Sequence, residues 1–364
     1  MKISDITIEL EQWAPLVYAE EFDNVGLLVG DSARDCKGVL ITHDVTDGVV
    51  EESISKGCNL IVCFHPIIFT GLKQLTSKGY VEKTVLKAIE NKIAIYAIHT
   101  ALDNHKNGIS YHLGKVLGLE NQQVLTSQKN SLFQLTTYVP SEEKENLLKA
   151  LHKAGAGEIG NYSKCSFSHQ GEGRFMGNEI SNPTIGNSGE LTKINEVQIR
   201  VVVTKHTKSN VLNALKEAHP YEVVAYELYS LENTNQEIGL GSIGILPNEM
   251  NVEPFMEMVK KQLNSPYIRH SNFLGKKIKN VAVLGGSGSF SIAAAIAQKA
   301  DALVTSDLKY HDFFKAENKL LLIDAGHFET EHFTKKIIHE FLTKKIPNFA
   351  ITLSQVDTNP VKYF

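Results

Sequence analysis

The chain has 364 residues, a length that predicts two or three domains and makes a single core improbable. Hydrophobic residues make up 42% and charged residues 21%, which is typical of a folded globular protein and excludes a disordered or fibrous chain. The formal net charge of −4 provides no overall basic field for nucleic acid, and no window holds the roughly 18 apolar residues of a membrane span.

The N-terminal third alternates short apolar runs, rich in β-branched residues, with helical stretches. We predict strands at 38–45, 59–64 and 93–99, and helices at 48–56, 81–91 and 109–117. Strands that are apolar throughout and separated by helices are typical of a parallel sheet that is buried on both faces.

The middle of the chain has a different order of predicted strands and helices. We predict strands at 132–140, at 165–169 with 173–177, at 197–204 and at 223–231, and helices over 142–154 and 209–218. This β-α-β-β-α-β order is the ferredoxin-like signature. The polar segment 177–192 is expected to be a loop within it.

The α/β pattern returns near the C-terminus. Strands are predicted at 280–286, 302–307 and 320–326, with helices at 291–300, 310–317 and 327–344. The simplest arrangement is one α/β core domain with parallel-rich sheets, built from residues 1–128 and 236–364 and interrupted by an inserted α+β domain at 129–235. The alternative, three domains in a row, leaves each flanking part with few strands.

The four cysteines, Cys36, Cys58, Cys63 and Cys165, form no CxxC pair. This argues against a zinc ribbon or a disulfide scaffold and is typical of reduced thiols. The first residues include acidic ones where a signal peptide needs an apolar segment. We therefore expect a cytoplasmic protein.

Polar side chains follow several of the predicted strands. In a doubly wound sheet, ligands bind beyond the carboxyl ends of the strands. Those positions hold potential metal ligands or their supports: His65, His99, Asp103, Asp307, His327 and Glu331. Four of these, His65, Asp103, His327 and Glu331, form a mixed nitrogen and oxygen set suited to Zn, Fe or Mn rather than Ca. His99 is expected to orient a ligand rather than to bind the ion itself.

His327 and Glu331 are four residues apart, so on a helix they project from one face and can reach the same ion. The alternative is an exposed helix start, where Glu329 and Glu331 complement the helix dipole. The matching positions of His65 and Asp103 after two other strands favour the metal interpretation.

A glycine-rich turn at 285–288 follows one predicted strand. Its amides would suit a phosphate at a helix N-terminus, or the glycines would only form a tight turn, and the sequence leaves both open. Asp307 lies where a dinucleotide fold has its ribose-binding acid, which permits an NAD hypothesis. That third choice leaves the histidines and carboxylates unexplained.

Motifs spread over nearly the whole chain resemble one known family. They are FDNVGLLVG at 22–30, FHPIIF at 64–69, IHTALDN at 98–104, GGSGS at 285–289, TSDLKYH at 305–311 and DAGHFETE at 324–331. The combination resembles the dinuclear metal-centre hexameric family of GTP cyclohydrolase 1 type 2 homologues, also called the Ngg-interacting-factor-like family. Segments 160–167, 171–175 and 219–229 resemble its optional insert, which is similar to the PII-type signalling and cation-tolerance folds.

The resemblance implies that His65, Asp103, His327 and Glu331 bind one or two divalent metal ions per subunit. It also implies a homohexamer with the metal sites facing an internal cavity. Many members have two consecutive histidines before the proline, whereas this chain has Phe64 and then His65. Because a phenyl ring has no lone pair for a metal, one of the two ions should lack an imidazole.

The function implied by the resemblance is a metal-dependent hydrolase acting on a nucleotide such as GTP, because paired ions acidify water and polarise a carbonyl or purine carbon. His99 or His311 would then move protons, and Lys309 or the 285–288 turn would meet phosphates. The alternative is a non-catalytic regulatory ring whose insert senses a small molecule or docks a partner. Nucleic-acid binding is a third hypothesis, against which the acidic balance weighs.

Overall fold

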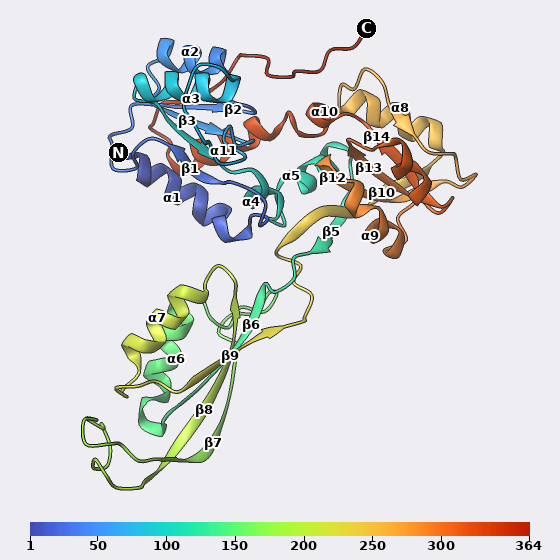
Figure 1. Cartoon of the computed structure of the whole chain (residues 1–364). Coiled ribbons are helices and arrows are strands. Elements are labelled where there is room, and N and C mark those ends of the chain that lie inside the picture. Colours follow the sequence, from blue (N-terminus) through green and yellow to red (C-terminus); the bar gives the residue numbers. More distant parts are fainter. The chain divides into compact units, whose positions relative to one another are not determined.

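A computed structural model describes residues 1–364, which form two compact units (Figure 1). We call Met1–Gln128 together with Gln236–Phe364 the core unit, and Lys129–Asn235 the insert unit. The core unit contains two sheets, and the insert unit contains one.

The first sheet of the core unit has the strand order β1-β4-β3-β2-β15. Its strands are β1 (Gly26–Val29), β2 (Val39–Thr42), β3 (Leu60–Cys63), β4 (Ala94–Ala97) and β15 (Ile351–Leu353). All pairs are parallel except β1 with β4. Every residue of β2, β3 and β4 is buried, as expected for apolar runs covered on both faces.

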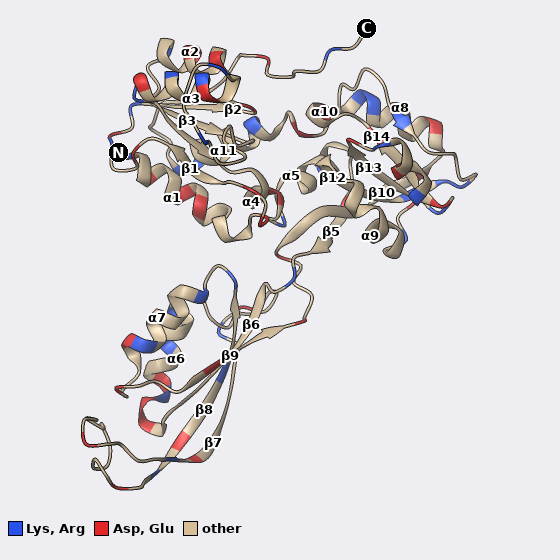
Figure 2. Cartoon of the chain, in the orientation of Figure 1, with Lys and Arg blue, Asp and Glu red and all other residues tan.

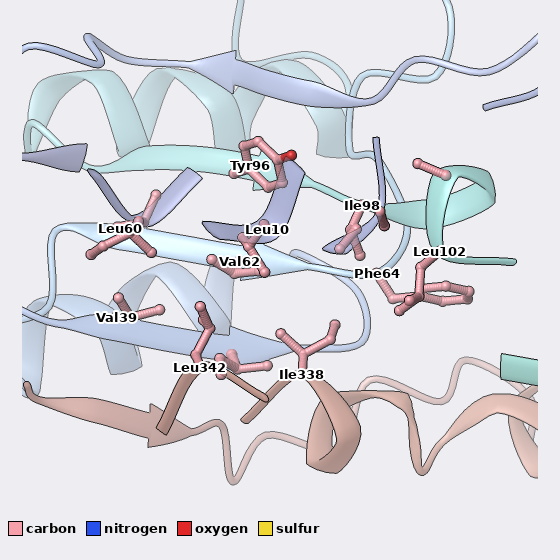
Figure 3. Close-up of a cluster of buried hydrophobic side chains, with 14 of the residues drawn as sticks. Leu10, Val39, Leu60, Val62, Phe64, Tyr96, Ile98, Leu102, Ile338 and Leu342 are labelled. Carbon is pink, nitrogen blue, oxygen red and sulfur yellow. The ribbon is translucent and has the colours of Figure 1, made fainter. Parts of the chain in front are cut away.

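Helices cover both faces of this sheet. Helices α1 (Ile3–Trp13) and α11 (Thr334–Lys345) pack on one face, where Leu10, Val62 and Leu342 belong to one buried cluster (Figure 3). Helices α2 (Asp47–Ser55) and α3 (Tyr80–Glu90) cover the other face. Because side chains alternate between the two faces along each strand, the sheet contributes to two separate cores.

The second sheet has the order β11-β14-β13-β12-β10-β5. Its strands are β5 (Glu120–Ser127), β10 (Gly239–Met250), β11 (Arg269–His270), β12 (Ile278–Ser287), β13 (Ala302–Ser306) and β14 (Leu321–Asp324). Strands β12, β13 and β14 are parallel, and the other pairs are antiparallel. Helices α5 (Ile109–Val116) and α8 (Val252–Gln262) pack on one face, and α9 (Ile292–Ala297) with the 3-10 segment η4 (Tyr310–Ala316) packs on the other. The predicted α/β class with parallel-rich sheets is confirmed.

The insert unit has the element order β-α-β-β-α-β. Its elements are β6 (Leu132–Pro140), α6 (Lys144–Lys153), β7 (Ser166–Phe175), β8 (Thr192–Thr204), α7 (Lys208–Ala218) and β9 (Tyr226–Leu231). The sheet is antiparallel throughout with the order β7-β8-β6-β9, and both helices contribute to its core. The polar segment 177–192 connects β7 to β8.

Two helix predictions near the C-terminus were wrong in detail. The helix predicted at 327–344 is two helices, α10 (His327–Glu331) and α11, and the Thr334 hydroxyl donates to the Glu331 carbonyl (2.6 Å) where the two meet. The helix predicted at 310–317 is the 3-10 segment η4. Shorter segments are the helix α4 (His99–Asp103) and the 3-10 turns Leu16–Tyr18, Ser141–Glu143 and Ser289–Ser291.

Basic and acidic residues are interspersed over both units (Figure 2). None of the helices has both the length and the apolar character that spanning a membrane requires. All four cysteines are free thiols.

Candidate metal centre

The first sheet brings three histidines to one edge. Strands β2, β3 and β4 are in parallel register at Thr42, Cys63 and Ala97, so the residues that follow leave the sheet at the same level. His43 follows β2, His65 follows β3, and His99 begins α4 after β4. The rings of His43 and His65 lie 4.6 Å apart, and those of His65 and His99 lie 5.1 Å apart.

The second half of the core unit contributes α10, which follows β14 directly. His327 and Glu331 lie one helical turn apart on α10, and His327 Nε2 is 3.1 Å from Glu331 Oε2. The rings of His65 and His327 lie 5.4 Å apart. The predicted pair on one helix face therefore lies beside the histidine that follows β3.

Each of three imidazoles is held by a carboxylate at Nδ1. His65 Nδ1 is 2.8 Å from Asp44 Oδ1, His99 Nδ1 is 2.8 Å from Asp23 Oδ1, and His327 Nδ1 is 2.7 Å from Asp307 Oδ2. A neutral imidazole that donates from Nδ1 presents a bare lone pair at Nε2. This carboxylate–histidine arrangement is the one that orients histidines toward metal ions.

Glu331 Oε2 is the point on which the imidazoles converge. It lies 3.1 Å from His327 Nε2, 3.3 Å from His65 Nε2 and 3.7 Å from His43 Nε2, and no hydrogen bond reaches it. Ligands that bind one ion at about 2.0–2.2 Å in tetrahedral geometry lie about 3.3–3.6 Å apart. The donor set and its spacing therefore fit a divalent cation.

The charges at the centre shift the pKa values so that the charged forms of His65, His327 and Glu331 are favoured. Burial lowers the pKa of His65, but contacts with Asp44 and Glu331 outweigh this and raise it to about 9. In the same way, Asp307 and Glu331 raise the pKa of His327 to about 11 against the effect of burial. Burial raises the pKa of Glu331, but the two histidines outweigh it and hold that pKa well below its ordinary value.

Asp103, at the end of α4, lines the same cavity as these side chains. It belongs to neither of the two close groups of donors, which are His43, Asp44 and His65, and His65, His327 and Glu331. Burial and the negative charge of Glu331 raise its pKa well above the ordinary value. Two buried carboxylates that repel each other in this way are stabilised by a cation placed between them.

The glycine-rich turn at 285–288 serves the centre in another way. The amides of Gly285, Gly286 and Gly288 already have protein partners: the Ser110 hydroxyl (3.5 Å), the Thr330 hydroxyl (3.0 Å) and the Ser306 carbonyl (3.4 Å). A side chain at Gly286, whose φ is +67°, would overlap Glu331 Oε1. The tight-turn alternative is therefore favoured over a phosphate cradle.

A cavity of about 710 Å³ opens over these side chains. Its lining also includes the aromatic residues Phe22, Phe69, Tyr267, Phe290 and Tyr363, together with Arg269. This volume is within the range of small-molecule sites. His311 and Lys309, predicted as a proton shuttle and a phosphate contact, do not line it, and the His311 ring contacts Tyr310 and Phe314 instead.

Sequence reasoning missed three side chains at the centre. His43 and Asp44 lie directly after β2, but the run 38–45 was interpreted as one strand, although its last residues include two that can bind metal. Asp23 lies in the loop before β1, 76 positions from His99, and no local pattern pointed to it. Applying the strand-end rule to β2 would have found the first two.

Comparison with known families shows to which family the chain belongs. Residues 1–360 match the Duf34/NIF3 (NGG1p interacting factor 3) family. The chain belongs to this family. The GTP cyclohydrolase 1 type 2 homolog of Bacillus subtilis (strain 168) is 36% identical over 362 residues, which cover 97% of this chain and 96% of the relative.

Solved structures of family members show the same fold. A Bacillus cereus protein related to NIF3 is 36% identical, with a TM-score of 0.84 and coverage of 100% of this chain and 99% of that chain. A Staphylococcus aureus protein is 31% identical, with a TM-score of 0.78 and the same coverage. The family predicted from the sequence motifs is confirmed.

Proposed function

We propose that this centre binds divalent metal ions and that the protein is a metal-dependent hydrolase acting on a nucleotide or a related small molecule. The observation that carries the proposal is the convergence of imidazole Nε2 atoms on the buried Oε2 of Glu331. Without an ion, protons on His65 and His327 balance the negative charge of Glu331, and a divalent cation can replace those protons and bind the same Nε2 and Oε2 atoms. Mixed imidazole and carboxylate donors favour Zn, Fe or Mn.

His65, His327, Glu331 and Asp103 would hold the metal. When bound, such ions acidify water and polarise the bond to be hydrolysed. The carboxylates of Asp44 and Asp307 keep His65 and His327 oriented toward the centre.

His99 is the candidate for proton transfer. Its Nδ1 is held by Asp23, which also accepts from the amide (3.1 Å) and the hydroxyl (2.5 Å) of Thr100, so its ring has one orientation. The side chain lines the cavity, where Nε2 can exchange a proton with a bound substrate. A substitution of His99 should therefore lower turnover more than it lowers metal content, which would distinguish His99 from the metal ligands.

The cavity lining supports a substrate with an aromatic base. The rings of Phe22 and Phe69 lie 6.3 Å apart, and both are exposed in this unit (66% and 48%). Exposed aromatic rings beside a polar cavity suit stacking on a nucleobase. The name of the curated relatives, GTP cyclohydrolase 1 type 2 homolog, makes GTP the first substrate to test.

The test is turnover of a nucleotide panel by metal-loaded protein, followed by chromatography and mass spectrometry. Wild type should hydrolyse at least one member, and His65→Ala and Glu331→Ala variants should lose that activity. Lys336→Ala, on the exposed face of α11, is the matched control and should retain it. Metal-loaded wild type that turns over no member faster than the Glu331→Ala variant would exclude the hydrolase.

A specific feature favours a second function. The insert unit has its own cavity of about 530 Å³, lined by Tyr138, His169, Arg174, Glu196 and Tyr221 among others. A mixed polar and aromatic lining of this size suits a small ligand, which is what a regulatory, ligand-sensing insert requires. Saturable binding of a metabolite by metal-loaded protein without turnover, abolished by Tyr221→Ala, would support this function instead.

We also propose a homohexamer, on the basis of the family resemblance. Light scattering on the full chain should give about six times the subunit mass of 40.3 kDa. A monomer or dimer mass at micromolar concentration would contradict the ring.

A further inference from the structure

His43 is a buried histidine that has no hydrogen-bond partner. Its side chain is 3% exposed, and neither Nδ1 nor Nε2 forms a hydrogen bond. A buried polar group without a partner destabilises a fold by about 1–3 kcal/mol. The presence of two such nitrogens on one ring therefore needs a physical reason.

The backbone fixes where this side chain lies. The His43 carbonyl accepts hydrogen bonds from the amides of Phe64 and His65, both at 3.1 Å, so the ends of β2 and β3 are tied together. The His43 ring lies 5.5 Å from the ring of Phe64 and 5.5 Å from that of Phe328. These two aromatic rings confine the imidazole inside the protein.

The open side of the ring faces the metal centre. His43 Nε2 lies 3.7 Å from Glu331 Oε2, an atom that also lacks a hydrogen bond. His43 forms a group with Asp44 and His65 in which one donor atom from each lies within 4.8 Å of the others. The donors of this group and those of the His65, His327 and Glu331 group share His65.

Phe64 lies in the core and supplies no donor. Its side chain is fully buried among the apolar residues of the first sheet, near Leu102 and Ile98 (Figure 3). The imidazole next to it comes instead from the neighbouring strand, through His43. The chain thus retains a second imidazole beside His65, delivered from β2 and not from β3.

We propose that His43 is a metal ligand in this protein and supplies the imidazole that Phe64 cannot provide. The inference rests on the proposed metal centre and names a donor in it. A ligand role explains why a ring with two unpartnered nitrogens is kept at a buried position beside His65 and Glu331, since the ion becomes the partner of one nitrogen. A purely structural His43 would gain nothing from those nitrogens.

The first experiment measures metal, not turnover. Full-length wild type and His43→Leu are loaded with Zn²⁺ and desalted, and metal per subunit is measured by plasma mass spectrometry, with affinity from chelator competition. We expect the variant to lose one equivalent, or to bind at least about 10-fold more weakly. His112→Leu, a substitution of a half-buried histidine on α5 outside the centre, is the matched control and should bind as wild type does.

Two further measurements separate loss of a ligand from loss of fold. Metal-free His43→Leu should melt at or above the temperature of metal-free wild type, because leucine removes two unpartnered polar atoms from a buried position that packs against Phe64 and Phe328. His43→Gln serves as a second variant and should show the same metal deficit. X-ray absorption on the Zn²⁺ forms should count fewer imidazoles per ion in both variants than in wild type.

A rescue tests the location directly. Phe64→His in the His43→Leu background returns an imidazole to the same place from β3, so it should restore the lost equivalent or affinity. Unchanged metal content, affinity and imidazole count in both His43 variants would overturn this inference while leaving the metal centre intact. If wild type bound no metal after loading with Zn²⁺, Fe²⁺ or Mn²⁺, the metal centre itself would be overturned, and this inference with it.

Discussion

Asp44 holds His65 by Nδ1 at 2.8 Å, and this contact decides which nitrogen of His65 faces Glu331. The Thr358 hydroxyl donates to the other oxygen of Asp44 at 2.9 Å, so the carboxylate is itself fixed. The geometry of the centre therefore depends on the carboxylate that orients His65 as well as on His65 itself.

Replacing this support should weaken metal binding. Asp44→Asn can donate to His65 Nδ1, which favours the tautomer with the proton on Nε2 and removes the lone pair from the centre. We expect metal affinity to fall about 10- to 100-fold in a chelator competition titration. Asp47→Asn, which alters only an ion pair with Lys83 and Lys87, is the control. Equal affinity in the two variants would contradict the orienting role.

The metal-free protein should lose stability as the pH rises. The pKa of His65 is about 9 and that of His327 about 11 in the folded chain, above the ordinary 6.5. The folded state then binds more protons than the unfolded state above pH 6.5, so this stabilisation is complete below 6.5 and is lost as the pH rises through those values. Urea unfolding of metal-free protein between pH 6.5 and 9 should show the decline. A His65→Gln, His327→Gln variant should show a flatter dependence, and an equally steep one would exclude these histidines as its source.

Metal binding should have the opposite pH dependence. Protons and metal ions compete for His65 and His327, so affinity for Zn²⁺ should rise over the same pH range. Competition titrations at several pH values measure this directly. A pH-independent affinity would show that these imidazoles are not ligands.

Gly286 should be intolerant of any side chain. Its φ of +67° and the overlap of a Cβ with Glu331 Oε1 predict that Gly286→Ala displaces Glu331. Gly275→Ala is a matched control, because Gly275 has a φ of +66° and open space around it. An alanine in this left-handed conformation costs about 1–2 kcal/mol of backbone strain in both variants. A metal deficit found only in Gly286→Ala would therefore come from the overlap with Glu331. Similar metal content in both would contradict the prediction.

The aromatic pair Phe22 and Phe69 in the cavity lining should affect substrate binding more than turnover. Loss of base stacking in Phe22→Ala or Phe69→Ala should raise KM about 5- to 150-fold for a nucleotide substrate, with a smaller change in kcat. Tyr310→Ala removes an exposed ring that does not line the cavity and should change neither. A KM effect of the same size in all three would exclude stacking.

The sequence predicted those parts of the centre that have a local signal. His65 and Asp103 follow apolar strands, and His327 and Glu331 have helical spacing, so strand ends and helix periodicity are enough to single them out. The structure places His65, His327 and Glu331 in one donor group and Asp103 in the lining of the same cavity. The α/β class was predictable for the same reason, because buried parallel strands are apolar throughout.

The remaining features depend on contacts between distant segments. Asp23 reaches His99 across 76 positions, and Gly286 is required by Glu331, 45 residues later, so neither relationship leaves a periodic pattern. The antiparallel strands β10 and β11 are set by tertiary pairing with β12 and β14. The break between α10 and α11 involves no glycine or proline, so the sequence does not signal it.

The insert unit begins and ends on neighbouring strands. Strands β5 and β10 pair antiparallel with Ser127 opposite Gly239, and the amide of Gln128 donates to the carbonyl of Ile238 at 3.0 Å. The chain therefore leaves and re-enters the core unit at almost the same point, and a tight hairpin turn could join the two strands. In evolutionary terms, a whole domain can be gained or lost at this position without changing the order, register or partners of any other strand, so short and long forms of such a protein can share one core.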